Sequence, residues 1–288
     1  MSEIIDIHPH VISSDNERFP LAPVGGKRSS WSTDHVIGHD ELVAEMDKAG
    51  IGKAVVVQAS TAYGHDNSYL VSAVKAHPDR FTGVFSVDAT APDAVEKIDY
   101  WRAQGLAGMR LFTAGSTMAG QSSWLGDPSS YPAWAHAEAI RLPVCVQMRP
   151  EGLGKLRELL ERFPEAIVIL DHLARADLTD GKPYLASKAL WDLAEFPGVH
   201  LKLTVRNIIA AETGASTLPD FLDQMLSTFG ARRVAWGSNF PAAETPLPEL
   251  VEKAQRALST LDAADRNEIF AGTAKRLYPV LTRLSEMA

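Results

Sequence analysis

The chain alternates between two kinds of segment when its hydrophobic and polar positions are followed in order. Short, continuous apolar runs such as 53–60 (KAVVVQAS) and 143–148 (PVCVQM) are typical of strands that are buried on both faces. Between these runs, apolar residues recur at helical spacing, for example Leu42, Val43 and Met46 within 40–49. Strands that alternate with helices in this way predict a parallel sheet.

Eight such strand-and-helix units follow one another along the chain. The predicted strands cover 5–10, 53–60, 81–87, 108–112, 143–148, 166–173, 199–205 and 233–240. The predicted helices cover 40–49, 68–77, 92–104, 131–140, 153–163, 185–196, 219–229, 247–258 and 263–276. Eight units in 288 residues favour an α/β fold that closes as a (β/α)8 TIM barrel, formed by a single domain over 1–288. An open, doubly wound sheet is the alternative, but no Gly-x-Gly-x-x-Gly turn follows the first strand.

The segment 11–38 follows neither periodicity and is too long for a simple connection. Long loops in compact domains are often functional. The side chains that would suit a lid over an anionic ligand are Lys27, Arg28, Trp31 and His35. An excursion over the surface is the alternative, and the sequence leaves both open.

The charge and cysteine content limit which binding partners and which cellular setting are expected. The formal charge of −8 argues against general binding to nucleic acid or to an anionic membrane. The single cysteine, Cys145, cannot form an internal disulfide, which favours a reducing, cytoplasmic setting. We find no signal-peptide pattern and no apolar run of about 20 residues, the length of a transmembrane helix. The expected partner is a small anionic substrate, with a homodimer as a further expectation.

Polar side chains gather where the predicted strands end. In a (β/α)8 barrel the catalytic residues lie at the carboxyl ends of the strands. The polar residues at these ends, or in the loops that follow, are His8, His10, Gln58, Ser60, Tyr63, Asp66, Asn67, Arg110, Gln147, Arg149, Asp171, His172, Arg175, Lys202, Thr204, Arg206, Ser238 and Asn239. Three histidines and several cations would therefore meet at one mouth, which is hard to explain as purely structural.

Three of these residues can be interpreted individually. Residues two apart on a strand point to the same side, so His8 and His10 would present two imidazoles together. The alternative is a strand end followed by two incidental histidines.

Lys202 lies within an apolar strand, where an unpaired ammonium is costly. We therefore expect Lys202 to have a partner in the barrel interior or to contact a ligand.

The arrangement resembles the amidohydrolase superfamily, and within it the amidohydrolase-related branch that includes 2-pyrone-4,6-dicarboxylate lactonase and sugar-acid lactonases. The resemblance covers nearly the whole chain. It rests on the stretches 6–10 (DIHPH), 57–60 (VQAS) with 63–67 (YGHDN), 108–110 (GMR), 170–175 (LDHLAR), 236–241 (WGSNFP) and on the tail with Ile269, Phe270, Ala274, Leu277 and Tyr278.

Two positions depart from the family pattern. In metal-dependent members, a histidine on the fifth strand and an aspartate on the eighth complete the metal site, whereas this chain has Gln147 and Asn239 there. An amide is a poor substitute for either ligand because it brings no charge. The resemblance then implies no cofactor, or a weakly held divalent ion (zinc or manganese) on His8, His10 and His172.

The resemblance also implies a lactonase mechanism without a metal. In it the histidines polarise the carbonyl or bind substrate, and an aspartate on the eighth strand acts as general base on water. Asn239 cannot accept a proton in a useful pKa range. The base would then be His172 or His10, with Asp66 as a further candidate.

The function expected from this reasoning is hydrolysis of a lactone or similar cyclic ester that carries carboxylates. The residues expected to be catalytic are His8, His10, His172 and Asn239. The residues expected to bind substrate are Tyr63, Asp66, Arg110, Gln147, Arg149, Arg175, Lys202 and Arg206. Two alternatives stay open at this point: a metal-dependent decarboxylase of the same superfamily, and a small-molecule-binding barrel without catalysis.

Overall fold

The computed structural model describes residues 3–283 and places eight parallel strands in one sheet, in the order β1 to β8. The strands are β1 (Ile5–Asp6), β2 (Lys53–Val57), β3 (Phe81–Ser86), β4 (Gly108–Phe112), β5 (Val144–Gln147), β6 (Val168–Asp171), β7 (Val199–Leu203) and β8 (Val234–Trp236). The backbone N–H of Ile7 donates to the carbonyl of Trp236 at 3.2 Å, which brings the first strand segment back to the last. The (β/α)8 barrel expected from the pattern is confirmed.

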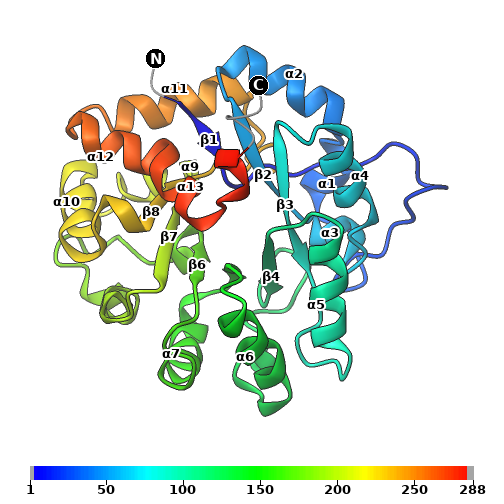
Figure 1. Ribbon diagram of the computed structural model, residues 1–288. Coiled ribbons are helices and arrows are strands. Elements are labelled where there is room, and N and C mark those ends of the chain that lie inside the picture. Colours follow the sequence, from blue (N-terminus) through cyan, green and yellow to red (C-terminus); the bar gives the residue numbers. More distant parts are fainter. Residues whose placement is uncertain (1–2, 284–288) are drawn as a thin grey trace.

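Helices surround the strands, as Figure 1 shows. The α-helices are α1 (Ser30–Asp34), α2 (His39–Ala49), α3 (Ser60–Tyr63), α4 (Ser68–Ala76), α5 (Ala94–Ala103), α6 (Tyr131–Ala139), α7 (Leu153–Arg162), α8 (Lys188–Trp191), α9 (Val205–Ala210), α10 (Leu218–Phe229), α11 (Leu247–Ala257), α12 (Ala263–Asn267), α13 (Thr273–Leu277) and α14 (Val280–Arg283). A π-helical turn, Glu268–Gly272, joins α12 to α13. Short 3-10 turns cover Ser123–Gly126, Pro128–Ser130, Pro150–Gly152, His172–Arg175, Leu185–Ser187, Asp192–Glu195 and Ala231–Arg233.

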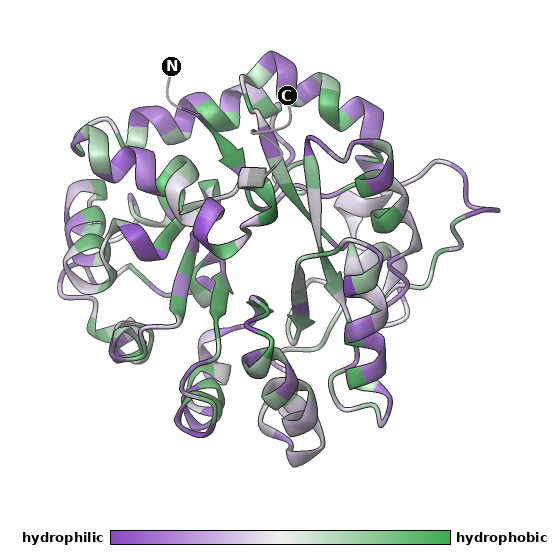
Figure 2. Ribbon diagram, in the orientation of Figure 1, coloured by the Kyte–Doolittle hydropathy of each residue, from purple (hydrophilic) through white to green (hydrophobic). Residues whose placement is uncertain are grey.

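The hydrophobic core has two parts. The larger lies between the strands and the surrounding helices, and includes Leu42, Trp134 and Phe221. The smaller fills the barrel interior, where strand residues such as Val55 and Ile169 pack against Tyr278 and its neighbours from the C-terminal helices. In Figure 2 the strands carry mostly hydrophobic colours and the outer helices carry mixed ones. This division is what a barrel that is buried on both faces of its sheet requires.

Several predicted elements are shorter than the pattern suggested. The strand expected over 5–10 forms a ladder only at Ile5–Asp6. Pro9 has no N–H to donate, although its carbonyl still accepts from the N–H of Val57 in β2 at 2.8 Å. The helix expected over 185–196 is broken into two 3-10 turns and α8. The helix expected over 263–276 is interrupted by the π-helical turn. The unassigned segment 11–38 contains a short helix, α1.

None of the helices among residues 3–283 combines the length and the apolar character that crossing a membrane would need.

Candidate active site

A buried ion cluster lies inside the barrel below its carboxyl-end mouth. Asp171, at the end of β6, forms an ion pair with Lys202 on β7, with Oδ1 2.7 Å from Nζ, and its other oxygen lies 3.3 Å from Arg110 Nη2 on β4. His8 Nδ1 lies 3.5 Å from Asp171 Oδ1. Burial alone would raise the pKa of Asp171, but Lys202, His8 and Arg110 together hold the pKa well below its ordinary value. Asp171 is therefore an anion that neutralises buried cations, as a buried charge requires.

The predicted role of Lys202 changes with this arrangement. Lys202 is completely buried and does not line the cavity described below, so it is not placed to bind substrate. Besides Asp171, its ammonium contacts Cys145 Sγ at 3.6 Å, on the interior side of β5. The sequence left open a barrel-interior partner or a ligand, and the structure shows the interior partner.

A second buried carboxylate fixes the loop that carries His8. Asp6 Oδ1 accepts from the backbone N–H of His8 at 2.9 Å and from that of Ser238 at 2.8 Å. At Gly237 a Cβ would lie 2.6 Å from His8 Cβ, so only glycine allows this approach. The end of β8 is thereby held against the His8 loop. The His8 ring lies beside both other histidines, with ring centroids 5.0 Å from His10 and 4.8 Å from His172.

The protonation of His10 follows from its hydrogen bond. Its Nδ1 lies 2.7 Å from the carbonyl oxygen of Val57, which can only accept, so Nδ1 carries the proton and Nε2 is a free lone pair. Burial, and next Arg110, lowers the pKa of His10 to about 3. The imidazole stacks on Trp31 of the long loop, with ring centroids 5.1 Å apart and planes at 27°.

His172 is held in the same tautomer by a three-residue chain. The Asn207 amide nitrogen donates to the carbonyl of His172, so Asn207 Oδ1 accepts from the Thr204 N–H at 3.0 Å and from the Thr204 hydroxyl at 3.1 Å. The Thr204 oxygen then accepts from His172 Nδ1 at 2.9 Å, leaving Nε2 of His172 unprotonated. Burial lowers the pKa of His172 to about 3. Two neutral imidazoles therefore offer free Nε2 lone pairs.

The backbone around His172 is strained. His172, Leu173, Ala174 and Arg175 all have positive φ, between 50° and 56°, which makes a short left-handed turn directly after β6. Left-handed helical geometry costs roughly 1–2 kcal/mol for each residue with a Cβ. Strain of this kind persists only where the surroundings enforce it, and it clusters at functional sites. Here the turn brings His172 and Arg175 to the wall of the same cavity.

That cavity has a volume of about 240 Å³ and lies at the mouth of the barrel. The predicted site residues that line it are His10, Arg110, Gln147, His172, Arg175, Arg206 and Asn239. The lining residues that were not predicted as site residues are Ser30, Trp31, Ser60, Thr61, Phe112, Gly115, Ser116, Ala242 and Glu244. A larger groove of about 630 Å³ lies beside α2 and the segment after β8, but its walls hold none of the three site histidines. We therefore place the site in the smaller cavity.

Two arginines of the cavity wall, Arg175 and Arg206, and the nearby Arg149 form no ion pair within residues 3–283. Nε of both Arg149 and Arg175 is buried without a hydrogen-bond partner. Burial, then the neighbouring Arg206 and Arg149, lowers the pKa of Arg175. Arginine binds carboxylates in a bidentate manner, so this cluster suits an anionic ligand.

Four predicted substrate-binding residues are not among those that line the cavity: Lys202, Arg149, Tyr63 and Asp66. The Tyr63 hydroxyl is turned into the long loop, where it accepts from the backbone N–H of Ser13 at 2.8 Å. Asp66 is exposed and caps the start of α4 by accepting from the N–H of Ser68 at 2.9 Å. Both residues are occupied structurally, so this geometry does not support them as substrate ligands or Asp66 as the base.

The long loop 11–38 covers part of the mouth. Its residues Ser30 and Trp31 line the cavity, and Val24 N–H donates to the carbonyl of Ser60 at 2.9 Å. Glu244, in the segment after β8, brings a carboxylate to the cavity wall from a left-handed residue with φ of 54°. Trp31 belonged to the segment predicted as a lid, whereas no local sequence signal pointed to Glu244. That the loop closes over a ligand stays a prediction.

Some residues at the barrel mouth favour a divalent metal ion and others disfavour it. The Nε2 lone pairs of His10 and His172 suit a transition metal. The carboxylate nearby, Asp171, is already held by Lys202 and Arg110, and Asn239 brings no charge. Within 3–283, the three histidines are not among the groups whose ligand atoms lie within 4.8 Å of one another. These residues do not form a ready-made metal site.

Comparisons with known proteins agree with the barrel fold. A family model described as Amidohydrolase matches residues 5–280. An L-fucono-1,5-lactonase from Burkholderia multivorans is 27% identical over 293 residues, covering 95% of each chain. A 2-pyrone-4,6-dicarboxylate hydrolase from Comamonas testosteroni is 27% identical over 259 residues, covering 82% of this chain and 76% of the relative. The structure of an amidohydrolase from Burkholderia multivorans with bound zinc superposes with a TM-score of 0.75 at 24% identity, covering 96% of this chain and 99% of the other.

Proposed function

The chain belongs to the amidohydrolase family, and from this premise we propose that it is a hydrolase that opens a carboxylated lactone by attack of water. The observation that carries the proposal is that two unprotonated imidazole nitrogens and two arginines without an ion pair, Arg175 and Arg206, lie at one cavity. The names of the relatives support ring opening, since one is a lactonase and the other a pyrone dicarboxylate hydrolase; the second name alone includes a carboxylated ring.

The arginines would bind the substrate first. A carboxylate held by Arg175 and Arg206 would pair with guanidinium groups that form no ion pair within residues 3–283. Arg206 is one of the charges that lower the pKa of His172, so neutralising it would raise that pKa again. Substrate binding would therefore strengthen His172 as a base at the moment when it is needed.

Water would then attack the ring carbonyl. His172 Nε2 would accept one proton from the water as its oxygen bonds to the carbonyl carbon, forming a tetrahedral intermediate with a negative oxygen. Arg110 and the Asn239 amide, both at the cavity wall, would donate to that oxygen. The intermediate would collapse by breaking the ring carbon–oxygen bond, and the imidazolium would return its proton to the leaving oxygen. The product is the open hydroxy acid.

We propose that this reaction runs without a metal ion. The buried cations Lys202 and Arg110 and the missing eighth-strand carboxylate support this reading, because both disfavour a dication at the mouth. A weakly held zinc or manganese ion on His8, His10 and His172 is the alternative, and a metal-dependent decarboxylase would need it. A cytoplasmic location is proposed with the same enzyme, since Cys145 is a buried, free thiol.

A panel of lactones tests the function. Aldono-1,5-lactones, 2-pyrone-4,6-dicarboxylate and their uncharged analogues would be offered to the wild-type protein, and ring opening would be followed by proton release at fixed pH. We expect carboxylated or polyhydroxylated rings to open above the background rate. Release of carbon dioxide would indicate the decarboxylase instead. Tight binding of the lactones with no product would indicate a barrel that binds without catalysis.

Replacing Arg175 by alanine tests the anion-binding part of the proposal. The change removes a charge-assisted, bidentate contact, so kcat/KM for a carboxylated lactone should fall by about 30- to 1000-fold, or about 2–4 kcal/mol. The uncharged analogue should lose much less. Arg256→Ala, on the exposed face of α11, serves as the matched control and should leave both rates unchanged. Equal losses for the charged and uncharged substrates would show that Arg175 does not bind the carboxylate.

A further inference from the structure

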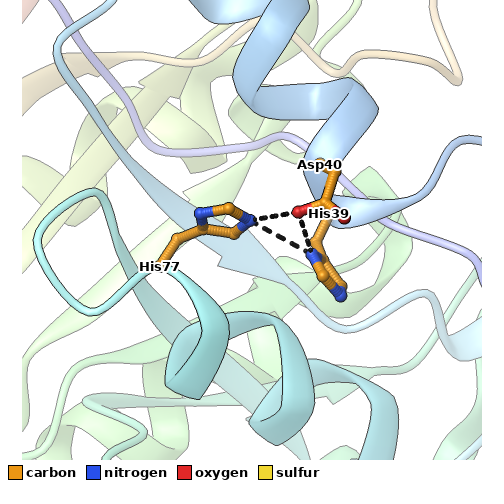
Figure 3. Close-up of side chains that lie close together, drawn as sticks. All are labelled: His39, Asp40 and His77. Carbon is orange, nitrogen blue, oxygen red and sulfur yellow. Dashed lines mark hydrogen bonds and ion pairs between the residues drawn. The ribbon is translucent and has the colours of Figure 1, made fainter.

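A second group of titratable side chains lies outside the cavity, where α2 begins and α4 ends. His39 and Asp40 open α2, and His77 caps the end of α4. Figure 3 shows the three side chains pointing toward one another. None of the three lines the cavity of the barrel mouth, and the proposed hydrolysis does not use them.

Three donor atoms of this group form a small triangle. Asp40 Oδ1 lies 2.7 Å from His77 Nε2 and 3.1 Å from His39 Nδ1, and the two nitrogens are 3.2 Å apart. Within 3–283 this is the one group of three or more His, Cys, Asp or Glu residues whose ligand atoms all lie within 4.8 Å. Ligands about 2.0–2.1 Å from a tetrahedral zinc ion are about 3.3 Å from one another, close to the observed spacing.

The contacts around the group hold it in this arrangement. The backbone N–H of His39 donates to the Tyr69 hydroxyl at 3.2 Å, and the His77 ring packs edge-on against Phe81 with centroids 5.4 Å apart. The two histidine side chains are only 20% and 22% exposed, whereas Asp40 is 79% exposed. The rings are therefore fixed on the protein side, and the carboxylate faces water, which leaves room for a solvent ligand.

The chemistry of the group suits a transition-metal dication. His39 Nδ1, His77 Nε2 and Asp40 Oδ1 all lie within 3.2 Å of one another, so a metal ion among them would be bound by two imidazole lone pairs and one carboxylate oxygen. Asp40 adds a carboxylate oxygen on the exposed side of the group. Two imidazoles and one carboxylate are a common zinc ligand set, with a fourth position left to water.

We propose that His39, Asp40 and His77 form a surface site for a dication of the zinc class that ties the start of α2 to the end of α4. The ion would bridge two elements that are 37 residues apart in the sequence, as measured from Asp40 to His77. Its place is separate from the barrel mouth, and the proposal does not depend on the lactonase activity.

Zinc titration of the chelator-treated, full-length protein tests the site. Calorimetry should show one zinc ion bound per chain, and Co²⁺ should give the visible absorption bands of a tetrahedral site. Loss of an outer-shell partner already costs about 10- to 100-fold in metal affinity, so losing a direct ligand in His77→Gln should cost at least about 100-fold. The thermal midpoint of the wild-type protein should rise by a few degrees with zinc, and that of H77Q should not.

Two further variants keep the result decisive. Asp40→Asn changes an exposed side chain and should fold normally, so it reports on the site if H77Q is unstable without metal. His172→Gln removes a lone pair at the barrel mouth and should leave zinc affinity unchanged. Absence of zinc binding by the wild-type protein would overturn the proposal. The proposal would also be overturned if zinc affinity is unchanged in both H77Q and D40N, or if zinc affinity is lost in H172Q alone.

Discussion

Replacing Asp171 by asparagine is expected to lower the free energy of unfolding by about 3–5 kcal/mol, because it leaves Lys202 and Arg110 buried without their anion. The amide has nearly the same shape as the carboxylate, so the loss of stability would come from the missing charge and not from a change in side-chain volume. The folded pKa of Asp171 is depressed, so its contribution is fully present above the unfolded pKa of about 3.9 and is lost as pH falls further. Urea denaturation at pH 7 measures the difference.

A surface aspartate provides the control for this variant. Asp192→Asn removes an exposed i,i+4 ion pair with Lys188 and should cost less than about 1 kcal/mol. Adding Lys202→Met to Asp171→Asn removes one of the stranded cations and should restore part of the loss. If the single variant is within about 1 kcal/mol of wild type, the cluster does not hold the barrel interior as described.

Replacing His172 by glutamine is expected to reduce kcat for lactone opening by about 100- to 10,000-fold, the usual contribution of a general base. The fold should be unaffected, since His172 is not part of the buried ion cluster and its turn is also anchored by Asn207 through the backbone. Initial rates of proton release measure the effect, and circular dichroism confirms the fold.

The pH dependence of kcat/KM gives a second test of His172 as the base. His172 works as a base only when unprotonated, and its pKa in the free protein is lowered to about 3. The value of kcat/KM should therefore stay level from neutral pH down to about pH 4 and fall only below that. A steep loss near pH 6.5, the ordinary histidine range, would contradict the buried, neutral imidazole.

Glu244 is the alternative candidate for the general base, so a Glu244 variant is the matched control for His172→Gln. It is the carboxylate among the residues that line the cavity, and it is exposed. Glu244→Gln should change kcat by less than about tenfold if His172 takes the proton. A large loss in E244Q together with a small one in H172Q would assign the base to Glu244.

The barrel could be predicted because each of its determinants is local. A continuous apolar run such as 53–60 indicates a buried strand by itself, and the repeat of such runs with helices between them fixes the fold class. Element ends were less predictable, because they depend on pairing between distant segments. The strand expected through His10 ends at Asp6, where its ladder with β2 ends.

The candidate site was predictable only as far as strand ends determine it. Gln147, His172 and Arg206 line the cavity because each ends or follows a strand, as expected, whereas Arg110 reaches it from within β4. The left-handed turn at 172–175 carries no glycine or asparagine and gave no local signal, because the surrounding structure imposes it. The pairing of His39 with His77 depends on how α2 and α4 pack, which no spacing in the sequence reveals.

The measurement that tests the central proposal most directly is ring opening by chelator-treated wild-type protein, with the metal content determined in the same sample. We expect a carboxylated lactone to open well above background while the bound metal is far below one ion per chain. Two results together would contradict a metal-free site built on His172 and the arginines. The protein would open no lactone until a stoichiometric amount of zinc or manganese is added back, and H172Q would abolish binding of that metal.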